Sequence, residues 1–437
     1  MELDNTTYKD LSVFQHEEEF SIFHRLCFTR TSQGRDWLIK YFSNPFSDLK
    51  PIIDTQKILR SIITHIDNWP NEISNGTLMV IEKFYDGNVD AIPNANTLNA
   101  LTYKLFNGAD FSLVRYSLSH FADLLKGMNR LALLLDDESA PLMIRTFLRR
   151  AADLINKPVL LELREHERGK EFTWRETLYY GGYIRDQFRL SAHELIAIFS
   201  RIDAWYSMAI ATQKLGLCFP EFIDQHHPVI EAHNLYHILL TTPTPYDVQL
   251  SPDNNFLFLT GANMAGKSTF IKAVGSTVFL AHLGMGVPAA SMRLTLFDGL
   301  LSNINVVDNI VKGESYFFNE VQRITHTITK INDGRKWLVL IDELFKGTNV
   351  QDAMKCSSVV IQGLIKIKSS LFILSTHLYE IGEELKKHPN ISFRYFETSV
   401  REDQLEFSYQ LREGISNDRL GYLILKREKV VDLLENL

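Results

Sequence analysis

The most informative segment of the second half of the chain is Gly261-Ala262-Asn263-Met264-Ala265-Gly266-Lys267-Ser268. It has the form G-x-x-x-x-G-K-S and stands between an apolar run and a helical pattern, the context that this phosphate-binding motif requires. The two glycines let the backbone curl so that its N–H groups surround phosphate oxygens, and the following helix adds partial positive charge. We expect Lys267 to reach the β- and γ-phosphates of a nucleotide and the Ser268 hydroxyl to bind Mg²⁺.

A second motif is an apolar run, residues 337–341, that ends in two carboxylates, Asp342 and Glu343. Alone, such a pair would indicate only a solvated strand end. Downstream of a phosphate loop, it places Asp342 to hold Mg²⁺ through water. The adjacent Glu343 would polarise the water that attacks the γ-phosphate. The pair therefore favours a nucleotide-hydrolysing enzyme over a kinase that transfers phosphate to a substrate hydroxyl.

A third candidate is His377, which follows the buried run at residues 371–374. Here it could sense the γ-phosphate or orient the attacking water. A lone histidine is more often a structural hydrogen-bonding residue. In the company of the other two motifs, we interpret His377 as catalytic.

Hydrophobic periodicity divides the chain into two halves. In the first half apolar residues recur three and four apart, as in residues 113–125 and 195–206, which predicts amphipathic helices. In the second half short apolar runs alternate with helical segments, which predicts a mostly parallel sheet with helices. We therefore predict an α + α/β fold, with an all-helical domain over residues 1–225 and an α/β domain over residues 226–437.

The end of the second half has a different pattern. Residues 391–400 and 405–411 read as two strands that flank a polar turn, which predicts a hairpin at one edge of the sheet.

Composition excludes several classes of protein. The 437 residues are 45% hydrophobic and 23% charged, as in an ordinary folded protein. With 46 Lys and Arg against 53 Asp and Glu, the net charge of -7 does not indicate a strongly basic nucleic-acid-binding protein.

The three cysteines lie far apart and lack metal-ligand spacing, which favours a reducing compartment. No apolar run reaches the roughly 18–20 residues of a membrane helix, and the acidic start is not a targeting signal. We predict a cytoplasmic protein without a membrane partner.

Residues 145–176 carry eight basic side chains that could contact a nucleic-acid backbone. The same window carries six carboxylates, which cancel most of that charge. We favour a solvated helical surface with i,i+4 ion pairs.

The motifs together resemble those of the MutS family. The phosphate loop continues to Thr269, and its Asn-Met pair stands where the family has Asn-Met before Gly-Gly-Lys-Ser-Thr. Residues 313–320 are similar to the family's signature segment, with Ser315 at its serine. Residues 342–349 and 375–377 resemble the catalytic strand end and the Ala-Thr-His segment.

The resemblance extends beyond the catalytic motifs. Residues 31–38 and 44–49 are similar to the start of the family's core domain, and residues 414–421 resemble the segment that opens its final helical region. The resemblance thus implies a helical core and lever domain followed by an ABC-type ATPase domain with a short C-terminal helical segment. Because the resemblance starts at the core domain, we expect no counterpart in this sequence of the mismatch-reading and connector domains that precede the core in the family.

Some positions depart from the family pattern. Ala262 replaces a proline, Ala265 replaces a glycine, and Lys346 stands where arginine is usual. On the adenine side, segment 243–247 lacks the family's phenylalanine, and Tyr246 is the candidate replacement.

The resemblance implies an ATPase that uses ATP and Mg²⁺ and works as a homodimer through the ATPase domain. Residues 261–269 would bind ATP, Ser268 and Asp342 the metal, and Glu343 and His377 would be catalytic. Ser315 would act in trans, on the nucleotide of the partner subunit, although in isolation it would be an ordinary loop serine.

The family's role implies binding of mismatched or branched DNA in mismatch repair or recombination. The alternative is a nucleotide-gated binding module for branched nucleic acid or a protein partner, without mismatch recognition. A regulator that hydrolyses ATP poorly and pairs with a full-length MutS protein is a third interpretation.

Overall fold

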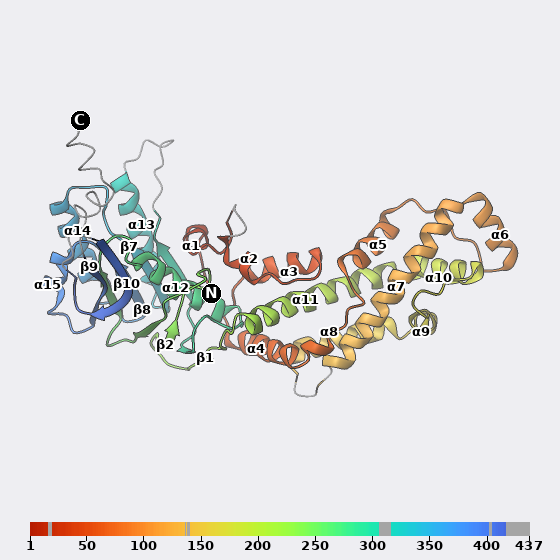
Figure 1. The fold of residues 1–437 in the computed structure, drawn as a ribbon, viewed down its shortest axis with the longest axis horizontal. Helices are drawn as coiled ribbons and strands as arrows, with labels where there is room; N and C mark the ends of the chain where they lie inside the picture. Colours follow the sequence, from red (N-terminus) through yellow and green to blue (C-terminus); the bar gives the residue numbers. More distant parts are fainter. Residues whose placement is uncertain (16–19, 136, 138–139, 306–315, 402–403, 417–437) are drawn as a thin grey trace. The chain divides into compact units, whose positions relative to one another are not determined.

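The computed structural model describes residues 1–15, 20–135, 137, 140–305, 316–401 and 404–416. By their contacts, the residues form two compact units (Figure 1). The helical unit comprises Leu26–Ser43 and Ile53–Lys214, and the sheet unit comprises Met1–Arg25, Asn44–Ile52 and Leu215–Leu437. The predicted α + α/β fold class is confirmed. Residues 1–15 and 20–25, which the sequence pattern groups with the helices, make their contacts in the sheet unit. The predicted boundary at residues 225/226 stays a prediction.

The helical unit is built around the long helix α7, against which α5, α6, α8, α9 and α10 pack. Buried side chains recur along α7 at spacings of three and four, including Phe111, Val114, Leu118, Phe121 and Leu125. This is the spacing that places side chains on one helix face. The predicted helices at residues 113–125 and 195–206 lie within α7 and α11. The helices are α3 (Ser32–Ser43), α4 (Leu49–Thr64), α5 (Asn75–Asp86), α6 (Thr97–Phe106), α7 (Gly108–Leu135), α8 (Leu142–Ile155), α9 (Pro158–Glu165), α10 (Trp174–Gln187) and α11 (Arg189–Lys214), with the 3-10 turn η2 (Ile66–Asn68).

A buried carboxylate on α11 fixes the start of α3. Asp203 accepts the N–H of Arg30 at 3.0 Å, and the N–H and hydroxyl of Thr31 at 3.0 and 2.7 Å. All three donors belong to the chain just before α3, so the hydrogen bonds of this carboxylate stabilise the fold.

The sheet unit contains a six-stranded sheet in the order β10-β9-β4-β8-β7-β6. All neighbouring pairs are parallel except β9 with β10, which form the predicted antiparallel hairpin at the edge. The strands are β4 (Phe256–Thr260), β6 (Gly299–Asn303), β7 (Trp337–Asp342), β8 (Ser370–Ser375), β9 (Ile391–Arg401) and β10 (Gln404–Glu413). A smaller four-stranded sheet, not predicted from the sequence, has the order β1 (Glu221–Phe222), β5 (Ser291–Leu294), β2 (Ile230–Leu235), β3 (Tyr246–Leu250).

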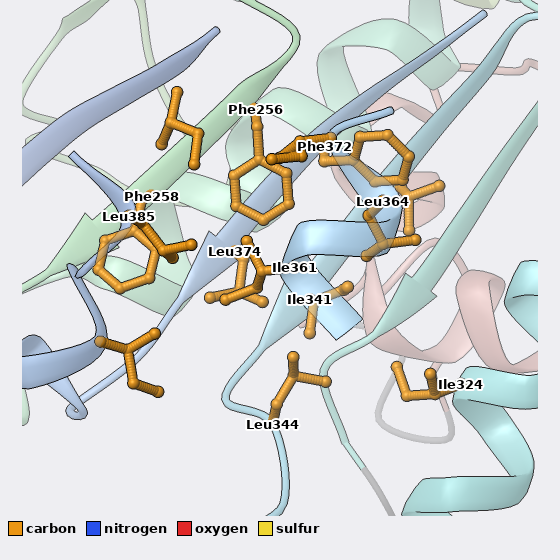
Figure 2. Packing of buried hydrophobic residues seen from close by; sticks show 14 of the residues in the cluster. Phe256, Phe258, Ile324, Ile341, Leu344, Ile361, Leu364, Phe372, Leu374 and Leu385 are labelled. Atoms are coloured by element: carbon orange, nitrogen blue, oxygen red, sulfur yellow. The ribbon is translucent and has the colours of Figure 1, made fainter. Parts of the chain in front are cut away.

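The core of this unit lies between the six-stranded sheet and its helices. Alternate side chains of the central strands, such as Phe256, Ile341 and Phe372, meet Ile361 and Leu364 of α14 (Figure 2). β4, β7 and β8 are buried along their whole length, as continuous apolar runs predict for central parallel strands. The helices of this unit are α1 (Asn5–Asp10), α2 (Ile22–Leu26), α12 (Lys267–His282), α13 (Tyr316–Ile331), α14 (Val350–Leu364) and α15 (Tyr379–Leu385).

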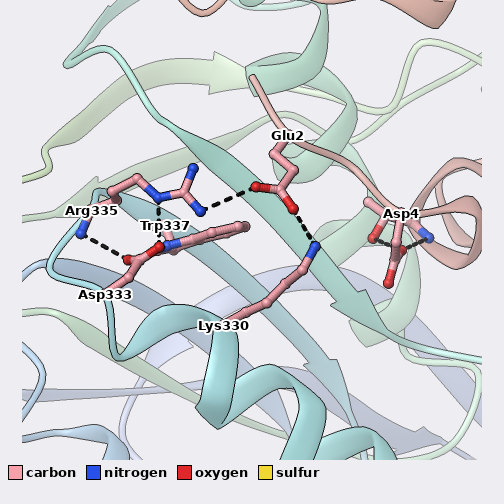
Figure 3. A network of polar contacts seen from close by, with 7 residues as sticks. Glu2, Asp4, Lys330, Asp333, Arg335 and Trp337 are labelled. Atoms are coloured by element: carbon pink, nitrogen blue, oxygen red, sulfur yellow. Dashed lines mark hydrogen bonds and ion pairs between the residues drawn. The ribbon is translucent and has the colours of Figure 1, made fainter.

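The first residues of the chain cover the edge strand β6. Glu2 forms a parallel bridge with Gly299, and its carboxylate binds Lys330 and Arg335 around the end of α13 (Figure 3). The buried carboxylate of Asp10 accepts the hydroxyl of Ser302 at 2.6 Å. Residues 1–10 therefore complete the sheet unit. Among the described helices, none is both long and apolar enough to cross a bilayer.

Candidate active site

Three neighbouring parallel strands bring the sequence motifs to one edge of the sheet. β4, β8 and β7 lie side by side, and they end at Thr260, Ser375 and Asp342. The phosphate-loop motif follows Thr260 directly, His377 lies two residues after Ser375, and the Asp342–Glu343 pair begins at the last residue of β7. Because the carboxyl ends of parallel strands meet at the same edge, this is where open α/β sheets bind their ligands.

The phosphate loop has the backbone geometry that its glycines allow. Gly261 and Gly266 have φ of 138° and 108°, and Met264 has φ of 67°. Gly266 is the left-handed N-cap residue of α12, which begins at Lys267. The free N–H groups of the first turn of α12 therefore stand at the end of the loop, where they favour an anion.

Lys267 is the buried cation of the site, with 5% of its surface exposed. Its Nζ donates to the carbonyl oxygens of Gly261 and Ala262 at 2.8 and 2.9 Å, and it lies 3.3 Å from His377 Nε2. Burial lowers the pKa of Lys267 to about 8, although the negative charges of Glu343 and Asp342 act to raise it. The ammonium is thus held on the loop, beside both carboxylates.

Glu343 is clamped between two basic side chains. Its Oε1 lies 2.7 Å from His377 Nε2, and its Oε2 lies 3.1 Å from Lys346 Nζ. Burial acts to raise its pKa, but the hydrogen bond and charge of His377 and the charge of Lys346 outweigh this and lower the pKa to about 2. Glu343 is therefore ionised throughout the neutral range.

The backbone that carries Glu343 is strained. Glu343 and Phe345 both have φ of 61°, a left-handed conformation that costs a residue other than glycine about 1–2 kcal/mol. Such a conformation persists only where its surroundings hold it. One support is the N–H of Glu343, which donates to Ser375 O at 2.9 Å.

The predicted metal ligands supply oxygen donors. Asp342 is 8% exposed, and its Oδ1 accepts a hydrogen bond from the Ser375 hydroxyl. Ser268 is exposed at the cavity described below. Mg²⁺ is usually bound by one or two protein oxygens together with waters and substrate phosphates, and this donor set fits that pattern. Within the described ranges, no group of three or more His, Cys, Asp or Glu residues could hold a metal by itself.

A cavity of about 470 Å³ opens in front of the loop. That volume suits a ligand of nucleotide size. Lys267, Ser268 and Glu343 share this cavity, whereas His377 lines a smaller hollow of about 150 Å³ together with Glu343. Ala262 and Ala265 are buried and do not line either space. The residues that line the cavity are Leu240, Thr242, Thr244, Tyr246, Asn263, Met264, Gly266, Lys267, Ser268, Thr269, Glu343 and Tyr409.

The wall beyond the loop is aromatic. Tyr246, the sequence candidate for the base side, meets the rings of Phe270 and Phe396 edge-on at 5.3 and 5.7 Å. Tyr409 stands on β10, where the pairing with β9 is irregular and its φ is 53°. No local pattern in the sequence signals that Tyr409 reaches the site, because its position depends on this irregular pairing.

Three sequence predictions fall outside this site. Ser315 lies outside the described residues, as does the short C-terminal helical segment after residue 416. In the basic stretch, the bidentate pair of Arg150 with Glu194 and the pair of Arg168 with Asp123 join different segments of the unit. The expected i,i+4 pattern is therefore wrong for these arginines, although their charge is balanced as predicted.

A G-x-x-x-x-G-K-S loop that links a central parallel strand to a helix, with a carboxylate at the end of the second strand along, defines the P-loop class of α/β domains. Comparison with known proteins narrows this class. Residues 257–432 match the family model for MutS domain V. This match and the relatives described below support a MutS family member.

Three named relatives agree with this match. The chain is 29% identical over 245 residues to the DNA mismatch repair protein msh3 of Aspergillus oryzae, an alignment that covers 53% of the chain and 21% of the relative. It is 28% identical over 256 residues to the DNA mismatch repair protein MutS of Oceanobacillus iheyensis, covering 56% of the chain and 28% of the relative. It is 29% identical over 206 residues to the DNA mismatch repair protein MutS of Petrotoga mobilis, an alignment that covers 47% of the chain and 24% of the relative. The aligned part is thus well under a third of these relatives' own length.

Proposed function

We propose that the sheet unit binds ATP with Mg²⁺ and hydrolyses it, and that the chain acts in DNA mismatch repair or a related DNA transaction. The observation that carries this proposal is the convergence of Lys267 and Glu343 on one cavity, with His377 between them. The DNA-related role rests on the family and on relatives that are named DNA mismatch repair proteins.

Binding would use the loop and the first turn of α12. The Lys267 ammonium exchanges its contacts with two loop carbonyls for phosphate oxygens, and backbone N–H groups of the loop bind the remaining oxygens. Ser268 and Asp342 would hold Mg²⁺, which supplies charge neutralisation on the phosphates. The aromatic wall at Tyr246 offers apolar surface for the base.

In the hydrolysis step, Glu343 accepts a hydrogen bond from water and so polarises and orients it toward the γ-phosphorus. A bond forms between the water oxygen and phosphorus, and the bond to the β,γ-bridging oxygen breaks. A carboxylate with a pKa of about 2 is a weak base, so the proton of the water leaves with the product phosphate. His377 and Lys346 keep Glu343 in its charged, hydrogen-bond-accepting form.

The proposal includes a homodimer in which Ser315 of the partner subunit completes each site, as the family resemblance implies. The test is the ATPase rate per subunit, measured against protein concentration. We expect the rate per subunit to rise with concentration and to reach a plateau. Absence of MgATP turnover at every concentration would contradict the proposed activity, and a constant rate per subunit would contradict the shared site.

The DNA-related role has a separate test. Gel-shift titrations with perfectly paired, mismatched and branched DNA, each with and without ATP, would measure which structure is bound. We expect a nucleotide-dependent preference for mismatched or branched DNA over the paired duplex. Equal affinity for all three, unaffected by ATP, would contradict this role.

A further inference from the structure

The segment after β7, residues 343–347, must hold Glu343 in a fixed direction for the proposed reaction. It carries Glu343, yet Glu343 and Phe345 are in left-handed conformations that ordinary side chains disfavour. The bond from Glu343 N–H to Ser375 O restrains only the start of the segment. Something else must hold the residues that follow Phe345, because the direction of the carboxylate depends on this turn.

A buried carboxylate on α13 holds them. The N–H of Lys346 donates to Glu320 Oε1 at 3.1 Å, and the N–H of Gly347 donates to Glu320 Oε2 at 3.2 Å. Glu320 is only 4% exposed, and among the described residues these two N–H groups are its hydrogen-bond partners. Both carboxylate oxygens are thus used to bind the backbone of the segment.

The same face of α13 makes a second contact with the segment. Phe317, one helical turn before Glu320, lies with its ring centroid 5.7 Å from that of Phe345. Residues three apart on a helix lie on the same face. The ring contact fixes the apolar side of the turn, and the carboxylate fixes its backbone.

We propose that Glu320 is a positioning residue for Glu343, which it serves by holding the strained turn at residues 343–347. This inference rests on the proposed ATPase function and deepens it, because it names a residue that governs turnover without touching the nucleotide. A buried carboxylate that contacts two adjacent N–H groups cannot be replaced by an amide without loss. Glutamine has one acceptor oxygen, and its NH₂ group would face the second N–H.

The test is E320Q, assayed for MgATP turnover and, separately, for ATP affinity. We expect kcat to fall about tenfold to a hundredfold, because a small displacement of a catalytic group is costly. The Kd for ATP should stay within about threefold, since Lys267 and the phosphate loop are untouched. A wild-type kcat in folded E320Q would overturn the proposal, and so would a parallel loss of kcat and ATP affinity.

A double-mutant cycle separates positioning from a general structural effect. If Glu320 acts through Glu343, E320Q should lower turnover no further in an E343Q background. A further loss of tenfold or more in the double variant would overturn the proposal. E2Q is the matched control, because it makes the same chemical change at the other end of α13, where Glu2 binds Lys330 and Arg335 (Figure 3). We expect its kcat to remain within about twofold of wild type.

Should E320Q fail to fold, E320D decides the matter. Aspartate keeps the charge and both oxygens but withdraws them by one methylene group, so both hydrogen bonds lengthen. We expect a several-fold lower kcat at unchanged ATP affinity, and wild-type turnover would overturn the proposal. Because the wild-type protein is assayed alongside, lack of turnover in every sample would count against the proposed ATPase function and not against the role of Glu320 alone.

Discussion

Each unit buries one charged side chain with a different role. In the helical unit, the carboxylate of Asp203 accepts hydrogen bonds from three donors of Arg30 and Thr31. In the sheet unit, the ammonium of Lys267 lies at the wall of a cavity, beside Glu343 and His377. Both groups lose hydration on folding. Burial raises the pKa of Asp203 above its usual range and lowers that of Lys267 to about 8. The two groups differ in whether a ligand can replace their hydrogen-bond partners.

Asp203 accepts hydrogen bonds from two backbone N–H groups and one hydroxyl group, and these bonds stabilise the fold of the helical unit. Lys267 bonds to loop carbonyls that a phosphate can replace, and Glu343 faces the same cavity. A buried charge therefore indicates a site only when its partners are exchangeable and a cavity adjoins it.

The largest effect is expected for E343Q. Loss of the carboxylate that polarises water should lower kcat by about 10²–10⁴-fold, while ATP still binds because Lys267 remains. Turnover and ATP affinity would be measured separately. E383Q, which changes an exposed, ion-paired glutamate of α15, should have wild-type values. Turnover of E343Q at the wild-type rate would remove Glu343 from the mechanism.

Next in size is K267A. Removal of the ammonium should weaken ATP binding by about a hundredfold or more, because a hydrogen bond from a charged group contributes about 1.5–3 kcal/mol and the ammonium can make more than one. Isothermal titration calorimetry measures the change directly. K355A, an exposed lysine of α14, is the control and should bind as the wild type does. Wild-type affinity in K267A would show that the cavity at the phosphate loop is not where ATP binds.

For the helical unit, D203A should reduce the free energy of unfolding by about 2 kcal/mol, since it strands buried donors. Urea denaturation followed by circular dichroism would report this loss. D153A, an exposed aspartate on α8, should change stability by less than about 0.5 kcal/mol. ATP affinity is expected to be unchanged in D203A. A weaker ATP affinity in D203A would contradict the purely structural role of Asp203, because it would show that this residue also affects nucleotide binding.

The smallest effect concerns pH. Above its pKa of about 8, Lys267 loses its charge in the free protein, so ATP affinity should fall as the pH rises. If bound phosphate keeps the lysine protonated, Kd should be nearly constant below pH 7.5 and about tenfold weaker at pH 9 than at pH 7. K267A should show no such dependence. A flat profile in the wild type up to pH 9 would show that burial does not lower this pKa.

Much of the sheet unit could be predicted from the sequence. The runs at residues 256–259, 337–341 and 371–374 are continuous and apolar, and they are buried central strands because hydrophobic residues on both faces require helices on both sides. The sequence does not indicate the edge strand β6, because Gly299–Asn303 has only two strongly apolar residues and pairs at its outer side with Glu2. The cover formed by residues 1–10 has no local signal, since its partners lie some 290 residues away in sequence.

The candidate site divides in the same way. The sequence alone determined the residue types that face a nucleotide, because a phosphate loop, a strand-end carboxylate pair and a histidine are local patterns with fixed chemistry. Long-range packing, which no local pattern encodes, brings His377 and Lys346 against Glu343 and places Tyr409 at the lining of the cavity. It also brings Glu320 to the turn from 26 and 27 residues away. The physical reason is that a local pattern specifies what a residue can do, whereas burial and long-range contacts determine the direction, charge and neighbours with which it does it.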